Sequence, residues 1–142
     1  MSLQEDQSLP TRLLVIRHAQ TEWNIERRFQ GHGDSPITEE GQEQLQRLKS
    51  RLAGLEFDVV YSSDLRRTME TSKMLSGKQR VEEPRLRERG VGILEGLNLE
   101  QIMADHAEAF RAFRSGSKDH QIEGGESLQN LSLIHISEPT RP

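Results

Sequence analysis

The chain has 142 residues, carries a net charge of −4 at pH 7 and contains no cysteine. Its length suits one domain with a hydrophobic core, and its charge argues against a protein bound mainly to nucleic acid or to an anionic membrane. The lack of cysteine excludes disulfides, thiolate zinc sites and cysteine nucleophiles, and the absence of an apolar stretch of about 18 residues or a signal-peptide pattern predicts a cytoplasmic protein.

The amino-terminal part is predicted to contain one strand followed by a long loop. Residues 1–11 are polar, and we expect them to be disordered. Residues 13–16 (LLVI) form a short apolar run typical of a buried strand, which would end at Arg17 and His18. Glycines and a proline within residues 19–37 indicate a loop with one short turn.

Helices and strands are predicted to alternate in the central part. Thr38 is placed to cap a helix that has two glutamates in its first turn and ends at Gly54. Residues 57–61 predict a second strand, Ser63 is placed to cap a second helix, and residues 79–82 predict a short third strand. This order is typical of a parallel sheet covered by helices, so we predict an α/β fold.

A third helix is predicted from residue 99 onward. Asn98 is placed as its cap, and Gln101 completes a capping box. A stripe of side chains at helical spacing follows: Leu99, Ile102, Met103, His106, Phe110 and Phe113. We assign this stripe, its histidine included, to packing.

Polar side chains follow the ends of the first two predicted strands. Arg17 and His18 end the first strand, and Arg67 lies one turn into the helix after the second. Because ligands bind beyond the carboxyl ends of parallel strands, these side chains are expected to share one crevice. Such a crevice would bind a phosphoryl group through the two arginines, Asn24 and the free N–H groups of a helix start. A neutral imidazole could then attack the phosphorus.

Glu88, after the third predicted strand, could protonate the leaving oxygen, so this scheme needs no metal. A metal hydrolase with His18, His32 and Asp34 as ligands is an alternative. A histidine and an aspartate in a glycine turn are more often turn residues than ligands. An Arg-His pair at a strand end, taken by itself, is also more often structural than catalytic.

Five motifs occur between residue 12 and about residue 130. They are RHAQTEWN at 17–24, QGHGDSPIT at 30–38, SSDLRRT with Thr71 at 62–71, LRERGVG followed by LEG at 86–96, and GGES at 124–127. In this order they resemble the motifs of the histidine phosphatase superfamily, the phosphoglycerate mutase-like enzymes. The resemblance implies a three-layer sandwich in which a mostly parallel sheet is flanked by helices.

The same resemblance implies roles for individual side chains. His18 matches the phosphorylated nucleophile of the family. The side chains that match its phosphoryl-binding positions are Arg17, Asn24 and Arg67. Glu88 matches the proton donor, so all five residues are candidates for the chemistry.

Gln30 and Gly31 match the substrate mouth of the family, whereas Arg66, one position from the motif arginine, is expected to face outward. The compact stretch from 97 to 123 resembles the phosphatase-type members, which favours hydrolysis of small phosphomonoesters over phosphoglycerate mutase action. Sugar phosphates, phosphoglycerates, and phosphates of nucleotide or cobalamin pathways all suit this class. The resemblance implies no metal and no other cofactor.

The sequence departs from the family pattern at two places. Ala19 stands where the family has glycine. The family also has a second histidine after a further helix and strand, and His135 does not match it because it lies only nine residues after Glu126. We therefore expect residues 12–130 to form an incomplete domain that lacks the last helix and strand. A non-catalytic phosphate-binding fragment remains an alternative.

Residues 131–142 are predicted not to belong to this domain. The stretch SLIHISEPTRP at 132–142 abandons the helical spacing begun by Leu128 and Leu131 and contains two prolines. It resembles the translation of a sequencing adapter. Our hypothesis is that the natural protein departs from this sequence after about Asn130.

Overall fold

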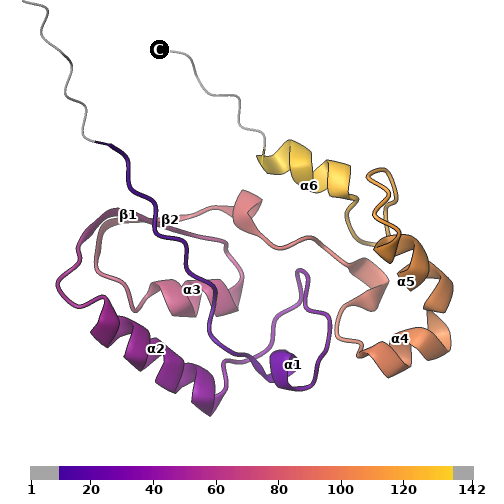
Figure 1. The fold of residues 1–142 in the computed structure, drawn as a ribbon, viewed down its shortest axis with the longest axis horizontal. Helices are drawn as coiled ribbons and strands as arrows, with labels where there is room; N and C mark the ends of the chain where they lie inside the picture. The colour runs from indigo at the N-terminus through magenta and orange to yellow at the C-terminus, as the bar shows by residue number, and fades with distance from the viewer. Residues whose placement is uncertain (1–9, 136–142) are drawn as a thin grey trace, which may run out of the picture.

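The computed structural model describes residues 10–135, and side chains as far as residue 131. Residues 1–9 and 136–142, which carry most of both predicted terminal segments, lie outside the described residues. One part of the molecule contains α2, β1, α3 and β2, and another contains α4, α5 and α6 (Figure 1). No helix in the described part is long and apolar enough to cross a membrane.

A parallel pair of strands, β1 (Phe57–Ser62) and β2 (Gly77–Glu82), forms the sheet. Their register pairs Val59 with Gln79 and Ser62 with Glu82. The connection between them contains α3 (Arg66–Ser72), which contacts β1. The predicted strands at 57–61 and 79–82 are thus confirmed, and so is the α/β class with a parallel sheet.

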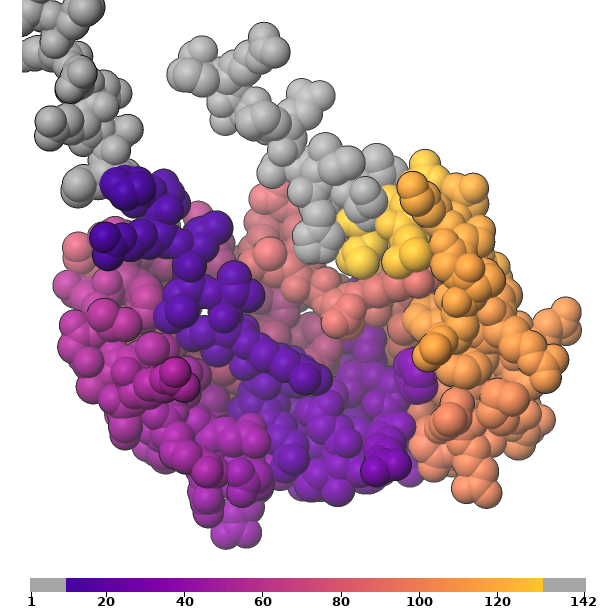
Figure 2. Space-filling view, viewed as in Figure 1, coloured from indigo at the N-terminus to yellow at the C-terminus, as the bar shows by residue number. Residues whose placement is uncertain are grey.

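The prediction of a strand at 13–16 is wrong. Residues 10–20 contain no strand, and the side chains of Leu13 and Val15 are 87% and 90% exposed. The segment instead runs along β1 and α3, with which it lines a cavity of about 460 Å³. Figure 2 shows this segment, in indigo, on the outside of the molecule. A buried strand needs hydrogen-bonding neighbours and two covered faces, and no described strand pairs with these residues.

The loop before the first long helix is closed by contacts at its two ends. It contains α1 (Glu22–Ile25), and an antiparallel bridge joins Thr21 to Ile37. The helix that follows, α2 (Glu39–Arg51), begins as predicted, because the Thr38 hydroxyl accepts a hydrogen bond from Gly41 N at 2.9 Å. Leu45, 3% exposed, lies on its buried face. The predicted loop and helix are confirmed.

Two short 3₁₀ turns, η1 (Pro84–Leu86) and η2 (Gly92–Leu94), lead to α4 (Leu99–Asp105) and α5 (Ala107–Arg114). The capping box of Asn98 and Gln101 is confirmed. The prediction of one continuous helix is wrong, because the backbone leaves helical geometry at His106. In the second of these helices, Phe110 lies edge-on to Phe29 at 5.8 Å between ring centres. These rings pack on a core of Val91, Leu94, Ile102 and Ile122.

The helix α6 (Leu128–His135) follows directly after the GGES motif. The Ser127 hydroxyl accepts a hydrogen bond from Asn130 N at 2.9 Å, and Asn130 Oδ1 accepts one from Ser127 N at 3.0 Å. The helix continues to His135, past the limit at residue 131 predicted from the apolar spacing. Reciprocal capping of this kind satisfies backbone N–H groups that a helix start leaves without partners.

Candidate active site

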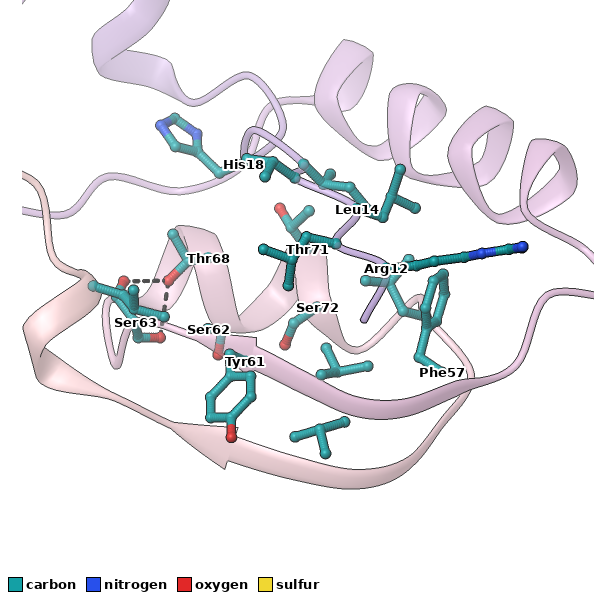
Figure 3. A pocket seen from close by; sticks show the side chains of 17 residues that line it. Arg12, Leu14, His18, Phe57, Tyr61, Ser62, Ser63, Thr68, Thr71 and Ser72 are labelled. Atoms are coloured by element: carbon teal, nitrogen blue, oxygen red, sulfur yellow. Dashed lines mark hydrogen bonds between the residues drawn. The ribbon is translucent and has the colours of Figure 1, made fainter. Parts of the chain in front are cut away.

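His18 lies at the carboxyl end of the 12–18 segment, and its side chain is half-buried. Its Nδ1 is 2.8 Å from the carbonyl oxygen of Ala19. A carbonyl oxygen only accepts hydrogen bonds, so the proton of the neutral ring belongs on Nδ1, and Nε2 carries the lone pair. Figure 3 shows the imidazole at one end of the cavity, on the segment that passes over α3.

Burial is the main reason why the pKa of His18 lies below its ordinary value of 6.5. The hydrogen bond with Ala19 opposes this effect. The positive charges of Arg67 and Arg17 lower the pKa further, and the negative charge of Asp34 raises it. The net result favours a neutral imidazole, which is the form that can act as a nucleophile.

Arg67, the second residue of α3, is buried against the loop that contains Gly31. Its Nη2 donates to Gly31 O at 2.8 Å, and its Nη1 donates to Gly33 O at 2.7 Å and to Asp34 Oδ1 at 3.0 Å. Its buried Nε has no hydrogen-bond partner in the described part of the chain. The guanidinium is thus fixed in direction, and these hydrogen bonds leave it one N–H on Nε and one on Nη2.

Asp34 is a site residue whose role the sequence analysis missed. One carboxylate oxygen accepts from Arg66 N at 2.8 Å and the other from Arg67 N at 3.5 Å. The same carboxylate forms the ion pair with the Arg67 side chain. Asp34 therefore caps α3 from a distant loop, and its place in the QGHGDSPIT motif was the only sequence signal for it.

The predicted helix start at Ser63 is wrong. The helix begins at Arg66, and the Ser63 hydroxyl lies 2.6 Å from the Thr68 hydroxyl instead of capping it. Because Asp34 accepts from the first N–H groups of α3, these groups are not free for a phosphoryl group. The outward position of Arg66 is confirmed, since its side chain is 62% exposed and pairs with Glu70.

Asn24 and Gln30 meet at the buried side chain of Thr21. Asn24 Oδ1 accepts from Thr21 N at 2.9 Å, and Gln30 Oε1 lies 3.1 Å from the Thr21 hydroxyl. The structure thus ties together the two ends of the 21–30 loop. It leaves the amide nitrogen of Asn24 as the group available to a ligand, because the oxygen is already bound.

Two other predicted residues have weaker connections to this centre. Arg17 is exposed and is linked to His18 through its charge. Glu88 is exposed, and its Oε1 accepts from the Arg89 backbone at 3.0 Å. The loop after it is held by Glu126, whose Oε2 accepts from Gly90 N at 2.8 Å. The charges of both arginines therefore act on His18, whereas the Glu88 side chain has a hydrogen bond to the backbone of its neighbour Arg89.

The alternative metal centre has no support in the arrangement of its proposed ligands. The Asp34 carboxylate forms an ion pair with the Arg67 side chain, and His32 Nε2 lies 3.4 Å from Glu126 Oε2. Between residues 10 and 131, no three histidine, aspartate or glutamate side chains are placed to hold one metal ion.

Comparisons with known proteins identify the family that this sequence and fold resemble. Residues 13–132 match the model of the histidine phosphatase superfamily (branch 1). A protein of Enterobacter sp. (strain 638) named "Probable phosphoglycerate mutase GpmB" is 35% identical over 122 residues, which are 84% of this chain and 57% of that protein. The chain thus spans little more than half the length of the curated relatives it matches.

Solved structures give the same result. The alpha-ribazole phosphatase from Shigella flexneri is 30% identical with a TM-score of 0.74, over 84% of this chain and 60% of the other. A mycobacterial glucosyl-3-phosphoglycerate phosphatase in complex with VO3 is 31% identical with a TM-score of 0.67, over 82% and 57%. The match of motifs, sequence and fold shows that the chain belongs to the histidine phosphatase superfamily (branch 1).

Proposed function

We propose that this chain carries the phosphoryl-transfer site of a phosphatase that hydrolyses small phosphomonoesters through a phosphohistidine at His18. The observation that carries the proposal is the 2.8 Å contact between His18 Nδ1 and Ala19 O, which leaves Nε2 as the nucleophilic nitrogen. The lowered pKa of His18 supports it, because the neutral ring then persists below pH 6.5.

In the first step Nε2 of His18 attacks phosphorus, and the bond between phosphorus and the ester oxygen breaks. We assign to Glu88 the proton that the leaving oxygen gains. In the second step water attacks phosphorus, the N–P bond breaks, and the proton of the water returns to the Glu88 carboxylate. Phosphate is released and His18 is regenerated, so no metal or redox partner is required.

The arginines would stabilise the charge on the transferring group. Arg67 suits this role because its guanidinium is held rigid by two carbonyl oxygens and a carboxylate. We assign phosphoryl binding also to Arg17 and to the Asn24 amide, and the mouth of the site to Gln30 and Gly31. The proposed partner is a small phosphorylated molecule, and the proposed location is the cytoplasm.

The test is to trap the phosphoryl group on the full chain and map it. Incubation with p-nitrophenyl phosphate, followed by quenching in base, is expected to leave a base-stable, acid-labile phosphoryl group on His18. His18→Asn should abolish it, and His106→Asn, a matched control at the junction of α4 and α5, should retain it. A phosphoryl group on another residue, or phosphate binding without any turnover, contradicts the proposal.

Mutase action is the second candidate, because the curated relatives carry the name phosphoglycerate mutase. Incubation of the full chain with 3-phosphoglycerate separates the two activities. Release of inorganic phosphate supports hydrolysis, whereas formation of 2-phosphoglycerate without phosphate release supports the mutase.

A further inference from the structure

Thr71 connects the segment that carries His18 with the helix that carries Arg67. The residue is buried, with 5% of its surface exposed, and lies near the end of α3. Its hydroxyl donates to the carbonyl oxygen of Arg67 at 2.8 Å and accepts from Ala19 N at 3.1 Å. Figure 3 shows Thr71 on α3 beneath the segment that leads to His18.

Few hydrogen bonds join the segment before and including Ala19 to the rest of the described chain. Within residues 10–19, the hydrogen bond from Ala19 N to Thr71 is the one that the structure gives to another segment of the described chain. No described strand pairs with this segment, and Leu13 and Val15 are exposed. The N–H of Ala19 is therefore held by a side-chain hydroxyl, and the next residue, Gln20, is held by Gln44 Oε1 at 3.0 Å and by Thr38 N at 3.1 Å.

The contact also reaches the imidazole. Ala19 donates its N–H to Thr71 and presents its carbonyl oxygen to His18 Nδ1 at 2.8 Å. A chain of three hydrogen bonds thus runs from the Arg67 carbonyl through Thr71 and Ala19 to the ring. If Ala19 turns, its carbonyl leaves Nδ1, and the proton of the neutral ring is free to move to Nε2.

We propose that Thr71 is a positioning residue that holds the backbone of Ala19, and through it keeps Nε2 of His18 unprotonated and directed at the phosphoryl group. The inference rests on the proposed function of His18 as nucleophile. Thr71 touches neither substrate nor the reacting atoms in this scheme, so its effect is on the geometry and the tautomer of His18.

The test compares three variants of the full chain. Thr71→Val has nearly the same shape and lacks the hydroxyl, and Thr71→Ser keeps the hydroxyl. Thr68→Val is the matched control, because Thr68 lies on the same helix and bonds to Ser63 and to the Leu65 carbonyl, away from Ala19. Circular dichroism checks that each variant is folded, and the pair Thr71→Ala and Thr71→Ser replaces the first comparison if Thr71→Val does not fold.

We expect Thr71→Val to lower kcat roughly 10- to 100-fold, with KM within about twofold, since a displaced nucleophile affects the transition state more than binding. Thr71→Ser and Thr68→Val should stay within about threefold of the unaltered chain. In ¹⁵N spectra the unaltered chain should show His18 protonated at Nδ1, and Thr71→Val should show a mixture of tautomers.

A Thr71→Val variant with unchanged kcat and unchanged tautomer would overturn the inference. Equal losses in Thr71→Ser would assign the effect to the methyl group and its packing, and would also overturn it. The tautomer readout is independent of turnover. If the unaltered chain forms no phosphohistidine, the proposed function fails, while a tautomer change confined to variants without the hydroxyl still supports the role of Thr71.

Discussion

Replacing Asp34 by alanine is expected to destabilise the protein through Arg67. The Asp34 carboxylate faces an Arg67 side chain that is only 3% exposed, at 3.0 Å, and it also accepts from the first two backbone N–H groups of α3. Its removal leaves a buried positive charge with two carbonyl acceptors and leaves the helix start without a cap.

The loss of folding stability in Asp34→Ala depends on how far the pair of Asp34 and Arg67 is shielded from water. Breaking a fully buried pair costs about 3–5 kcal/mol, whereas an exposed pair contributes about 0–1 kcal/mol. The Asp34 side chain is 28% exposed and open to solvent screening, so we take a charge contribution of about 1 kcal/mol, the upper end of the range for exposed pairs. Loss of the cap adds about 1 kcal/mol. Asp34→Ala should therefore cost about 2 kcal/mol, or a fall in Tm of about 8 °C for a chain of this size.

Urea unfolding followed by circular dichroism measures this cost. Asp34→Asn keeps an oxygen for the helix start and loses the charge, so it should cost about half as much. Asp58→Ala, which breaks the exposed pair with Lys78, is the control and should cost less than about 0.5 kcal/mol. A loss for Asp34→Ala no larger than for Asp58→Ala would show that the carbonyls of Gly31 and Gly33 suffice to hold Arg67.

Three further predictions concern the same site. Arg17→Gln removes a positive charge that lowers the pKa of His18, so the acid limb of the rate–pH profile should move to higher pH, and an unmoved limb would contradict this. The native pKa lies below 6.5, so the unfolded chain takes up the proton first on acidification, and the free energy of unfolding should fall as pH drops below 6.5. Gly31→Ala should cost roughly 2–3 kcal/mol in urea unfolding, because Gly31 has φ +53° and an added Cβ would lie 2.7 Å from Glu95 Oε1. Gly54→Ala, at φ +86° with open space around it, should cost only about 1 kcal/mol.

Local sequence signals predicted the helices and strands whose partners lie nearby. Thr38 and Asn98 cap their helices through residues three positions away, and β1 and β2 pair across one short helix. The wrong prediction of a strand at 13–16 shows the limit of such signals. The apolar residues of this segment satisfy the local pattern, but a strand forms only where other strands supply hydrogen bonds and cover.

The predictions of the site residues show the same difference between local signals and distant contacts. The placement of His18 near Arg67 followed from the ends of two predicted strands, although one of those strands does not form. The role of Asp34 could not be derived, because a carboxylate that caps a helix more than 30 residues away leaves no periodic pattern. The break at His106 was equally hidden, because the apolar spacing continues through it from Ile102 to Phe110.

The catalytic candidates depend on residues that do no chemistry themselves. Asp34 and the carbonyls of Gly31 and Gly33 hold the Arg67 side chain. Thr71 accepts a hydrogen bond from the N–H of Ala19, whose carbonyl oxygen contacts His18. Both supports join segments that are distant in the sequence, and both meet on α3. Since α3 also contacts β1, a change that loosens this helix should misplace the proposed nucleophile and the proposed phosphoryl-binding arginine together. Loss of activity in such a variant would therefore exceed what its loss of stability alone predicts.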